Sequence, residues 1–510
     1  METCNQDNPA LARGGKSITL PNLPACYYSS SAPPYQSMSI LMPLFVIFVV
    51  IVIFNIIIFV HELGHFLAAR WRGLAVERFQ IWFGKPIWSK TYNGVQYGLG
   101  WIPFGGFVAL PQMATMEKIE GENTTDAPLP PAKPLDKIIV AFAGPLFSFI
   151  LAIITAFAVW GVGKPSYKMN SVTVGYIMPD KPAAEAKPAF QEGDKILAVN
   201  GIEVDRWRGD TDTGISENIM LSEGQTIEFT VKREGLSEPI IVKSGYHIPD
   251  TAWFDRRAMR QVGIMMGYRT LVGELIEHSP AQRAGLQAGD EILTINGKKA
   301  HTYQHIIDAE LSGEPAAIVI LRDGKQQTFS ITASKPISPE GSEPTFGIMQ
   351  GPDPELVTST ITHPTAWEQI EHSVGIMYTT ITKVVSSQSD VGVQHLAGPI
   401  GIGKGYYQML TSPDGWKMAL SFTVLFNINL AILNMLPFPV LDGGHITLSI
   451  LEIIARRPVQ PRVLEFVQTA FVLMIMGLFL FITSKDVGSF FTSSEEAKTP
   501  VFEEPAKSGG

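Results

Sequence analysis

Four long apolar stretches, separated by polar sequence, organise this chain. They cover about residues 39–60, 138–162, 418–436 and 463–483. A helix needs about 20 mainly apolar residues to cross the hydrocarbon core of a bilayer, and each stretch is close to that length. The first stretch is too long for a cleaved signal peptide and continues into further helical sequence. The pattern therefore predicts a polytopic α-helical membrane protein with about four transmembrane helices.

The sequence between the first two apolar stretches has a different pattern. Short apolar runs broken by glycine and by Asn93-Gly94 occupy residues 80–110, which predicts β-hairpins. The last of these runs, 101–108, is apolar and rich in glycine. Residues 112–134 are polar, acidic and rich in proline, which predicts a mobile loop. We expect this part of the chain to form a membrane-associated β-hairpin region.

An internal repeat lies between the second and third apolar stretches. Residues 192–201 (EGDKILAVNG) return as 288–297 (AGDEILTING), and a Gly-x-x…Pro-Ala block precedes each copy. Self-similarity of this kind indicates two copies of one supersecondary unit. The repeat resembles a pair of PDZ domains, which bind a peptide as an added strand at a sheet edge. No carboxylate-binding loop stands out in either copy, so peptide C-termini remain candidate ligands only.

Basic residues predict how the chain crosses the membrane. Arg70 and Arg72 follow the first apolar stretch, and Arg456, Arg457 and Arg462 lie between the third and the fourth. By the positive-inside rule both loops are cytoplasmic. Both termini and the two PDZ-like units are then extracytoplasmic. We expect the lipid bilayer to be a permanent partner of the protein.

Composition and charge narrow the class further. The chain has 510 residues, of which 45% are hydrophobic, and its net charge is -9. The acidic balance and the absence of basic clusters exclude nucleic acid as an expected partner. The two cysteines, Cys4 and Cys26, both lie in a tail over 1–37 that we expect to be disordered, so no disulfide framework holds the fold. Translation from Met38 is as compatible with the sequence as translation from Met1.

The strongest chemical signal is the sequence from His61 to His65 at the inner end of the first apolar stretch. Two histidines four residues apart on a helix point to one face and can bind one zinc ion. Glu62 can accept a proton from a water molecule at the metal. Two buried histidines without a metal are the alternative. Ionisable residues at membrane depth are functional candidates by default, which favours the zinc site.

A catalytic zinc usually has three protein ligands and one open position. The candidate for the third ligand is Asp442, which ends the third apolar stretch and precedes two glycines. An aspartate there could instead cap the following helix. The topology favours a ligand, because it places Asp442 at the same cytoplasmic depth as His61. We expect His445, three residues later, to pack against its own or a neighbouring helix rather than to bind metal.

With these motifs the chain resembles the site-2 proteases, a family of intramembrane zinc metalloproteases, and most closely their bacterial regulator-of-sigma-E branch. The resemblance covers about residues 40–485 and rests on five motifs besides the PDZ pair: His61-Glu62-x-x-His65, Ile102 to Val108, Phe142-Ala143-Gly144-Pro145, Gly398-Pro399-Ile400, and Asn434-x-x-Pro437-x-Pro439-x-Leu441-Asp442-Gly443. Ala109 departs from the family, which often has lysine there. The tail before Ser39 is also unlike the family's short N-terminus.

The resemblance implies an activity and a set of roles. One zinc ion per chain is held by His61, His65 and Asp442, and Glu62 is the general base. Asn434 and Asn429 contact the substrate or the oxyanion, although hydrogen bonds between membrane helices are an equally good explanation of both. An edge strand at Gly105, Gly106, Phe107 and Val108 pairs with the unwound substrate.

The implied reaction is regulated intramembrane proteolysis of single-span membrane proteins. The implied substrates are an anti-sigma factor that an earlier protease has already cut, and remnant signal peptides. The implied location is the bacterial inner membrane, with the PDZ domains periplasmic and the active site near the cytoplasmic face. A catalytically inactive, membrane-anchored PDZ scaffold and a metal transporter are the competing hypotheses. The intact metal motifs disfavour the scaffold, and the lack of other buried charges disfavours the transporter.

These patterns divide the chain into ten consecutive segments. They are a tail (1–37), transmembrane helix 1 (38–70), the hairpin region and loop (71–137), transmembrane helix 2 (138–162), PDZ domain 1 (171–245), PDZ domain 2 (262–335), a connector with an amphipathic helix (336–415), transmembrane helix 3 (416–445), a cytoplasmic loop with transmembrane helix 4 (446–485) and an acidic tail (486–510).

Overall fold

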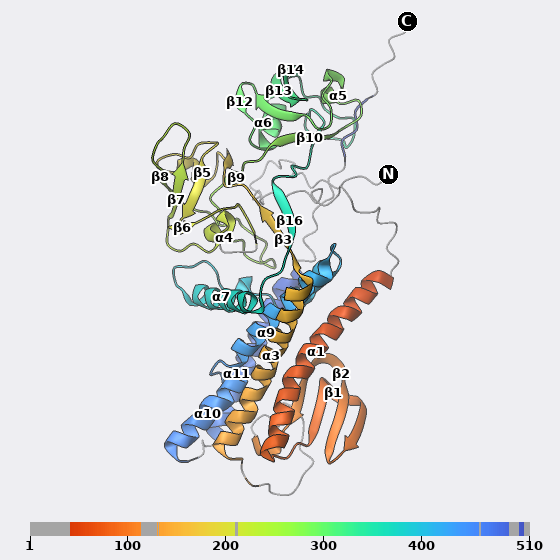
Figure 1. Cartoon of the computed structure of the whole chain (residues 1–510), viewed down its shortest axis with the longest axis vertical. Coiled ribbons are helices and arrows are strands. Elements are labelled where there is room, and N and C mark those ends of the chain that lie inside the picture. The colour runs from red at the N-terminus through yellow and green to blue at the C-terminus, as the bar shows by residue number, and fades with distance from the viewer. Residues whose placement is uncertain are drawn as a thin grey trace.

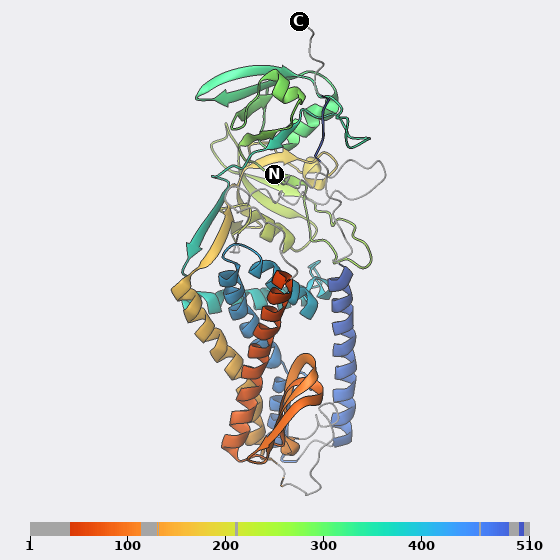
Figure 2. The same cartoon turned by 90° about the vertical axis from the view of Figure 1, so that its right-hand side faces the viewer.

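A computed structural model describes residues 41–113, 130, 132–209, 213–457, 461–488 and 499–503. The expected N-terminal tail, most of the loop at 112–134 and most of the acidic C-terminal tail lie outside these residues. The described chain is elongated, with long helices at one end and two β-rich units at the other (Figures 1 and 2). The β-hairpin lies at the far end of the helical part, away from the two units (Figure 1).

Four helices are long and apolar enough to cross a membrane, as the hydropathy pattern predicts. They are α1 (Leu41–Arg72), α3 (Pro134–Val162), α9 (Gly415–Asn434) and α11 (Pro461–Gly488). Helix α1 packs against α3, and α3 packs against α9. The cluster of α1, α3 and α9 forms the centre of the membrane part.

The third predicted helix, 416–445, is wrong as one continuous element. Helix α9 ends at Asn434, and a separate helix, α10 (Asp442–Ala455), begins after a short loop. Pro437 and Pro439 explain the break, because proline lacks the N–H that a helix interior needs and disfavours helical conformation in the residue before it. The break places Asp442 at the first position of a new helix.

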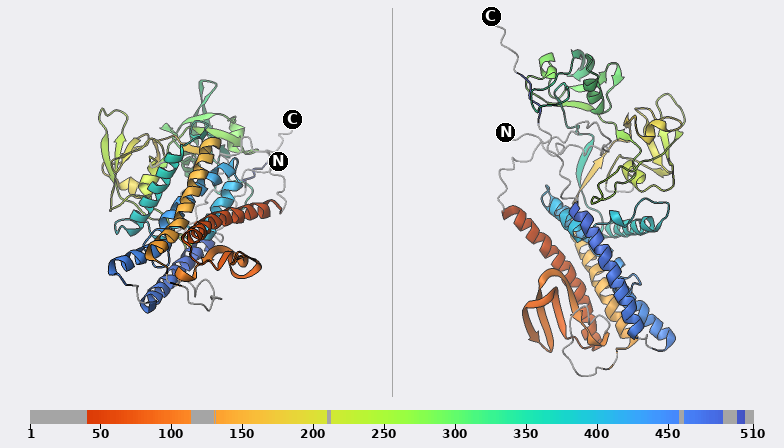
Figure 3. Two further views of the ribbon diagram at one scale, coloured as in Figure 1. Left: turned by 60° about the horizontal axis from the view of Figure 1, so that its bottom comes forward. Right: turned by 180° about the vertical axis from the view of Figure 1, so that it is seen from behind.

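The hairpin region consists of β1 (Arg78–Tyr92) and β2 (Val95–Ala109), joined at Asn93-Gly94. Both turn residues have positive φ, 48° and 79°, as a tight hairpin turn requires. The strands are antiparallel and bend. Residues 78–81 therefore pair with residues 96–99 along one edge and with residues 106–109 along the other. The hairpin packs beside the C-terminal half of α1 (Figures 1 and 3). The predicted β-structure at 80–110 is therefore present, and a short 3-10 helix, η2 (Pro111–Met113), follows it.

A two-stranded stem connects the helices to the two β-rich units. Strand β3 (Lys164–Met169) follows α3 directly, and β16 (Val357–Thr362) returns toward the helices. The strands are antiparallel, with Lys164 opposite Thr362 and Met169 opposite Val357. The stem is visible between the units and the helices in Figure 1.

The two β-rich units repeat one order of elements. The first unit (174–266) contains β4 (Val174–Ile177), η3 (Pro182–Glu185), β5 (Lys195–Val199), β6 (Ile202–Glu203), α4 (Ile215–Met220), β7 (Ile227–Lys232), β8 (Ile240–Ser244) and β9 (Ile264–Met266). The second unit (270–350) contains β10 (Thr270–Leu275), α5 (Pro280–Ala284), β11 (Glu291–Ile295), β12 (Lys298–Lys299), α6 (Gln304–Ser312), β13 (Ala316–Arg322), β14 (Lys325–Ile331) and β15 (Ile348–Gln350).

Strand pairing shows that each unit extends beyond its predicted end. The first strand of each unit pairs with its last, β4 with β9 and β10 with β15. Strand β9 therefore belongs to the first unit, although it lies inside the predicted range 262–335, and β15 lies beyond that range. The central blocks of the two units are similar in sequence, whereas each closing strand pairs with a strand about 75 to 90 residues away. Local patterns do not reveal such a contact.

The repeated Gly-Asp pair has the same structural role in both units. Asp194 is buried and accepts two hydrogen bonds from Arg233, at 2.8 Å each. Asp290 is buried in the same way and accepts two from Arg322, at 2.6 Å each. A buried carboxylate requires such a partner, because an unpaired buried charge is strongly destabilising. The repeat therefore preserves a buried ion pair at the edge of each core.

The segment after the second unit leads back to the membrane helices. Helix α7 (Ala366–Val385) confirms the predicted amphipathic helix and lies across the ends of α3 and α9 that face the two β-rich units (Figure 1). The short η4 (Val393–His395) and α8 (Pro399–Leu410) precede α9. At the C-terminus, Val501 forms a β-bridge with Ser338 and Phe502 is buried against the second unit. This part of the predicted acidic tail is therefore packed.

Candidate metal centre

The three predicted metal ligands meet where α1 faces the start of α10. The Nε2 atoms of His61 and His65 are 3.3 Å apart. The carboxylate of Asp442 approaches both rings, with Oδ2 3.3 Å from His61 Nε2 and Oδ1 3.4 Å from His65 Nε2. Within the described residues these three side chains form the one cluster of histidine, cysteine and acidic groups close enough to hold a metal ion. His445 lies outside it.

The distances fit a tetrahedral zinc site. Zinc binds imidazole nitrogen and carboxylate oxygen at about 2.0–2.2 Å, so two ligand atoms of a tetrahedral site lie about 3.3–3.5 Å apart. The 3.3 Å between the two Nε2 atoms agrees with that edge length. Each Nε2 also has one oxygen of Asp442 at a comparable distance, Oδ2 for His61 and Oδ1 for His65. Binding through two nitrogens and one of these oxygens would leave the fourth position open, as in catalytic sites.

Local sequence explains how the ligands come together. His61 and His65 are four residues apart on α1 and therefore share one face. Asp442 is the first residue of α10. The loop after α9 folds against the start of this helix. A Cβ atom at Gly443 would lie 2.2 Å from the carbonyl oxygen of Met435, and one at Gly444 would lie 2.0 Å from that of Phe438. The two glycines after Asp442 therefore let this loop fold closely over the start of α10.

Helix α3 supplies the groups that orient both imidazoles. His65 Nδ1 lies 2.8 Å from the carbonyl oxygen of Val140, which can only accept a hydrogen bond. Nδ1 of His65 therefore carries the proton, and the Nε2 lone pair is free to bind a metal. His61 Nδ1 lies 3.0 Å from the hydroxyl of buried Ser148. Hydrogen bonds of this kind to the second ring nitrogen usually hold metal-binding histidines in position.

A glycine on α3 makes room for the two rings. A Cβ atom at Gly144 would lie 2.2 Å from His65 Nε2 and 2.9 Å from His61 Nε2. On α1, a Cβ atom at Gly64 would lie 2.4 Å from the carbonyl oxygen of Ala143. The close contact of α1 and α3 at the site therefore depends on glycine in both helices.

Glu62 lies between the histidines and the hairpin. A Cβ atom at Gly106 would be in van der Waals contact with Glu62 Cγ, at 3.4 Å. Gly106 is opposite Ile81, and Phe107 is opposite Gln80 and stacks on Phe83. The predicted edge segment from Gly105 to Val108 thus lies beside the predicted base.

The two predicted asparagines differ in position. Asn434 Nδ2 lies 3.4 Å from His61 Nε2, so Asn434 is part of the site. The side-chain oxygen of Asn429 is buried without a hydrogen-bond partner in the described structure, so this oxygen makes no hydrogen bond to the site there. The sequence prediction missed Ser148, although it lies four residues after Gly144 and hence on the same face of one helix.

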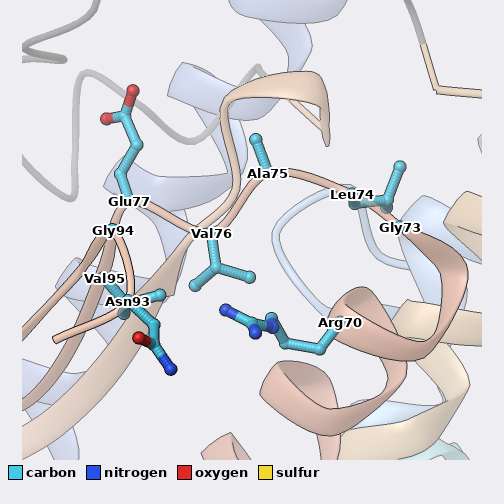
Figure 4. Close-up of a pocket in the computed structure, with 9 residues that line it drawn as sticks. All are labelled: Arg70, Gly73, Leu74, Ala75, Val76, Glu77, Asn93, Gly94 and Val95. Atoms are coloured by element: carbon cyan, nitrogen blue, oxygen red, sulfur yellow. The ribbon is translucent and has the colours of Figure 1, made fainter.

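A separate pocket lies where α1 ends and the hairpin turns (Figure 4). Its lining consists of Arg70, residues 73–77 and residues 93–95. None of the predicted site residues lines this pocket. The metal cluster lies closer to the N-terminus of α1, at His61 and His65.

Comparison with known proteins agrees with this geometry. The model of peptidase family M50 matches residues 49–478. The regulator of sigma-E protease RseP of Escherichia coli is 29% identical over 466 residues, which cover 84% of this chain and 96% of that protein. The protease RseP of Yersinia pestis is 29% identical over 468 residues, with the same coverage. A Vibrio cholerae protein that carries a zinc metalloprotease name is 29% identical over 81% of this chain and 92% of its own length.

Among solved structures, the PDZ domain of the SdrC-like protein from Listeria monocytogenes covers 16% of this chain and 88% of its own chain. Its sequence identity is 24% and its TM-score 0.15, so it carries no argument about the fold. The family match extends over most of the chain and includes the positions of all three residues of the metal cluster. The chain therefore belongs to peptidase family M50, the site-2 protease family, and is a zinc metalloprotease.

Proposed function

We propose that this metalloprotease cleaves single-span membrane proteins inside the bilayer. The observation that carries the proposal is the convergence of His61, His65 and Asp442 on helices that can cross a membrane or adjoin such helices. The proposed substrates are an anti-sigma factor already shortened by a first protease and remnant signal peptides. The membership of the M50 family and the names of the RseP relatives support this choice.

His61, His65 and Asp442 are the proposed ligands of one zinc ion per chain. A zinc ion bound there would polarise the scissile carbonyl and acidify water. Val140 and Ser148 hold the imidazoles so that each Nε2 faces the site. Asn434, next to His61, is placed to contact the substrate carbonyl.

Glu62 is the proposed general base. It accepts a proton from the attacking water and later transfers that proton to the nitrogen of the leaving amine. Its neighbours are His61 in the chain and Gly106 across the hairpin contact. The base therefore lies between the metal ligands and the strand that would hold the substrate.

The hairpin edge from Gly105 to Val108 is the proposed binding strand for the substrate. A helix inside a membrane satisfies its own backbone hydrogen bonds, so an unwound substrate needs new backbone partners. Residues 106–109 pair with residues 78–81, and we propose that their other edge receives the substrate as an added strand. A proline at Phe107 would remove a donor, and we expect it to lower proteolysis while zinc content stays unchanged.

We further propose that the two β-rich units are extracytoplasmic PDZ domains that exclude substrates with large external domains. The positive-inside rule places the hairpin end of the protein in the cytoplasm and the units on the opposite, periplasmic side. In the second unit, Tyr303 donates its hydroxyl to the carbonyl of Ile348, and Glu310 accepts from the backbone N–H of Phe346 at 2.8 Å. Side chains of this unit already bind the carbonyl of Ile348 in β15 and the N–H of Phe346 just before it, so we propose peptide C-termini as ligands of the first unit.

The experiment that tests the proposal is cleavage of a tagged single-span substrate by the purified wild type and by Glu62→Gln. We expect the wild type to cleave, Glu62→Gln to be inactive, and both to contain about one zinc ion per chain. Glu62→Gln with wild-type activity would refute the role of Glu62. A wild type that contains no zinc would favour an inactive membrane-anchored scaffold.

A further inference from the structure

One residue of the hairpin has an unusual backbone conformation. Trp82 has φ of 68°, a left-handed conformation that bulky residues rarely adopt. Trp82 lies where the hairpin bends, because Ile81 is opposite Gly106, whereas Pro86 is opposite Gly100. A bulky residue keeps such a conformation only where its surroundings enforce it. Two side chains do so here.

The first is Gln80, which is fully buried. Its side-chain amide donates to the carbonyl oxygen of Trp82 at 2.9 Å and to that of Gly84 at 2.8 Å. The second is Asn55 on α1, whose Oδ1 accepts a hydrogen bond from the indole Nε1 of Trp82 at 2.5 Å. Together they fix the bend from within the hairpin and from the neighbouring helix.

Asn55 is a polar residue in a very apolar helix. The helix that contains it has a segment of mean hydropathy 3.2. Polar side chains in such a position need hydrogen-bond partners, because the hydrocarbon supplies none. The amide of Asn55 donates to the carbonyl of Ile51, one turn earlier, at 2.7 Å. The side-chain oxygen of Asn55 accepts the hydrogen bond from Trp82, so the donor and the acceptor group of this amide each have a partner.

This contact lies on the face of α1 that carries the predicted base. Asn55, Ile58 and Glu62 are spaced by three and four residues and hence share a face. A Cβ atom at Gly106 would lie 3.1 Å from Ile58 Cγ2 and 3.4 Å from Glu62 Cγ. The hairpin therefore contacts α1 at Asn55 and again about 10 Å further along, at Glu62.

A short path of bonds joins the two contacts. The indole of Trp82 bonds to Asn55, and the carbonyl of Trp82 bonds to the side chain of Gln80. The backbone of Gln80 is opposite Phe107, which follows Gly106. A displacement of Trp82 along α1 would therefore shift the edge from Gly105 to Val108 relative to Glu62.

We propose that the hydrogen bond between Asn55 and Trp82 is a positioning contact that selects which peptide bond of the substrate is cleaved. A substrate strand paired with the hairpin edge presents one peptide bond to Glu62, and the contact between Asn55 and Trp82 fixes the position of that edge along α1. Without this contact, the edge takes several positions along α1, and neighbouring peptide bonds reach Glu62. This inference rests on the proposed role of the hairpin edge in substrate binding.

The test is a double-mutant cycle on the full-length protein. Asn55→Leu, Trp82→Phe and the double variant are compared with the wild type, and Trp88→Phe is the matched control, because Trp88 lies in the same strand and is 57% exposed. The probe is a tagged single-span substrate, and the products are identified by mass spectrometry. Loss of one hydrogen bond predicts a roughly five- to ten-fold lower kcat/KM for each single variant.

The expected result has three parts. The double variant is no slower than the single variants, each of the three gives products cut at adjacent bonds, and Trp88→Phe matches the wild type. The proposal would be overturned if the loss of kcat/KM in the double variant equalled the product of the two single losses. It would also be overturned if every variant cut the substrate only at the wild-type peptide bond. A merely structural role would lower the rate without changing the position of the cut.

Hydrogen exchange of residues 78–84 provides a measurement that does not depend on activity. We expect faster exchange in Asn55→Leu and in Trp82→Phe to the same extent, with zinc content unchanged. Unchanged exchange in both variants would overturn the contact. A zinc-loaded wild type that cleaves no single-span substrate would instead refute the proposed function, and the exchange data would still decide on the contact.

Discussion

Replacement of Gly144 by alanine tests the site geometry most directly. The new Cβ atom would lie 2.2 Å from His65 Nε2 and 2.5 Å from His65 Cε1. Real Cβ contacts almost never fall below 3.0 Å, so the ring or α3 must move by at least 0.8 Å, the difference between 3.0 and 2.2 Å. Metal–ligand distances tolerate only about 0.2 Å. We therefore expect Gly144→Ala to lose zinc.

The size of the effect on activity follows from the same displacement. A misplacement of about 1 Å at a reacting group can cost about 100-fold in rate. Loss of the ion itself would lower the rate further. We expect kcat/KM for a single-span substrate to fall at least about 100-fold. Helix stability works in the opposite direction, because alanine is favoured over glycine in a helix by about 1 kcal/mol.

Gly161, in the same helix, is the matched control, because a Cβ atom there has nothing within 4 Å. Gly161→Ala receives the same gain in helix propensity without the contact. We expect wild-type zinc content and activity within about two-fold, given its open surroundings. Zinc content by elemental analysis and cleavage rate are measured on both variants. A Gly144→Ala protein that retains zinc and cleaves normally would refute the packing of α3 against the two histidines.

Three further predictions concern other parts of the structure. Ser148→Ala removes the hydrogen-bond partner of His61, so we expect zinc affinity to fall about 10- to 100-fold in chelator competition. Burial raises the pKa of Glu310 to about 7, against 4.5 as its ordinary value, so the folded state binds the proton first. Stability of the second unit should then rise by about 3 kcal/mol as the pH falls from 7 to 4.5, and Glu310→Gln should remove this dependence in thermal unfolding. Arg233→Met leaves Asp194 buried without its partner, and we expect the first unit to lose about 3–5 kcal/mol by hydrogen exchange.

Each of these three has a result that would contradict it. Unchanged chelator sensitivity in Ser148→Ala would mean that other contacts orient His61. A second unit that becomes less stable at low pH would show that Glu310 is charged when folded. Global rather than local destabilisation by Arg233→Met would mean that the two units unfold together.

The sequence predicts those features that depend on local spacing. The helical face shared by His61 and His65 follows from a separation of four residues, and the spans follow from run length. The place of Asp442 follows from topology, because a span that runs inward ends at the depth of His61. Pro437 and Pro439 also carried a local signal, the end of α9, which the prediction of one helix over 416–445 overlooked.

Features that depend on contacts between distant segments could not be predicted in this way. Ser148 meets His61 across 87 residues, and Asn55 meets Trp82 across 27. Neither pair has a spacing that marks it in the sequence. The closing strand β15 and the buried Phe502 are of the same kind, because their partners are fixed by the tertiary fold alone.

The stem formed by β3 and β16 has a practical consequence. Met169 lies opposite Val357, so the chain leaves the membrane part and returns to it at neighbouring points. Paired residues on antiparallel strands are only about 5 Å apart at Cα, a gap that a two-residue turn closes. The two units thus have the topology of an insertion into a hairpin, and domain insertions are tolerated at such turns. Excision of residues 170–356 with a short turn would retain the stem, whereas a deletion of 171–335 would leave β15 without its partner. Such a minimal protease would separate the reaction in the membrane from any selection of substrates by the units outside it.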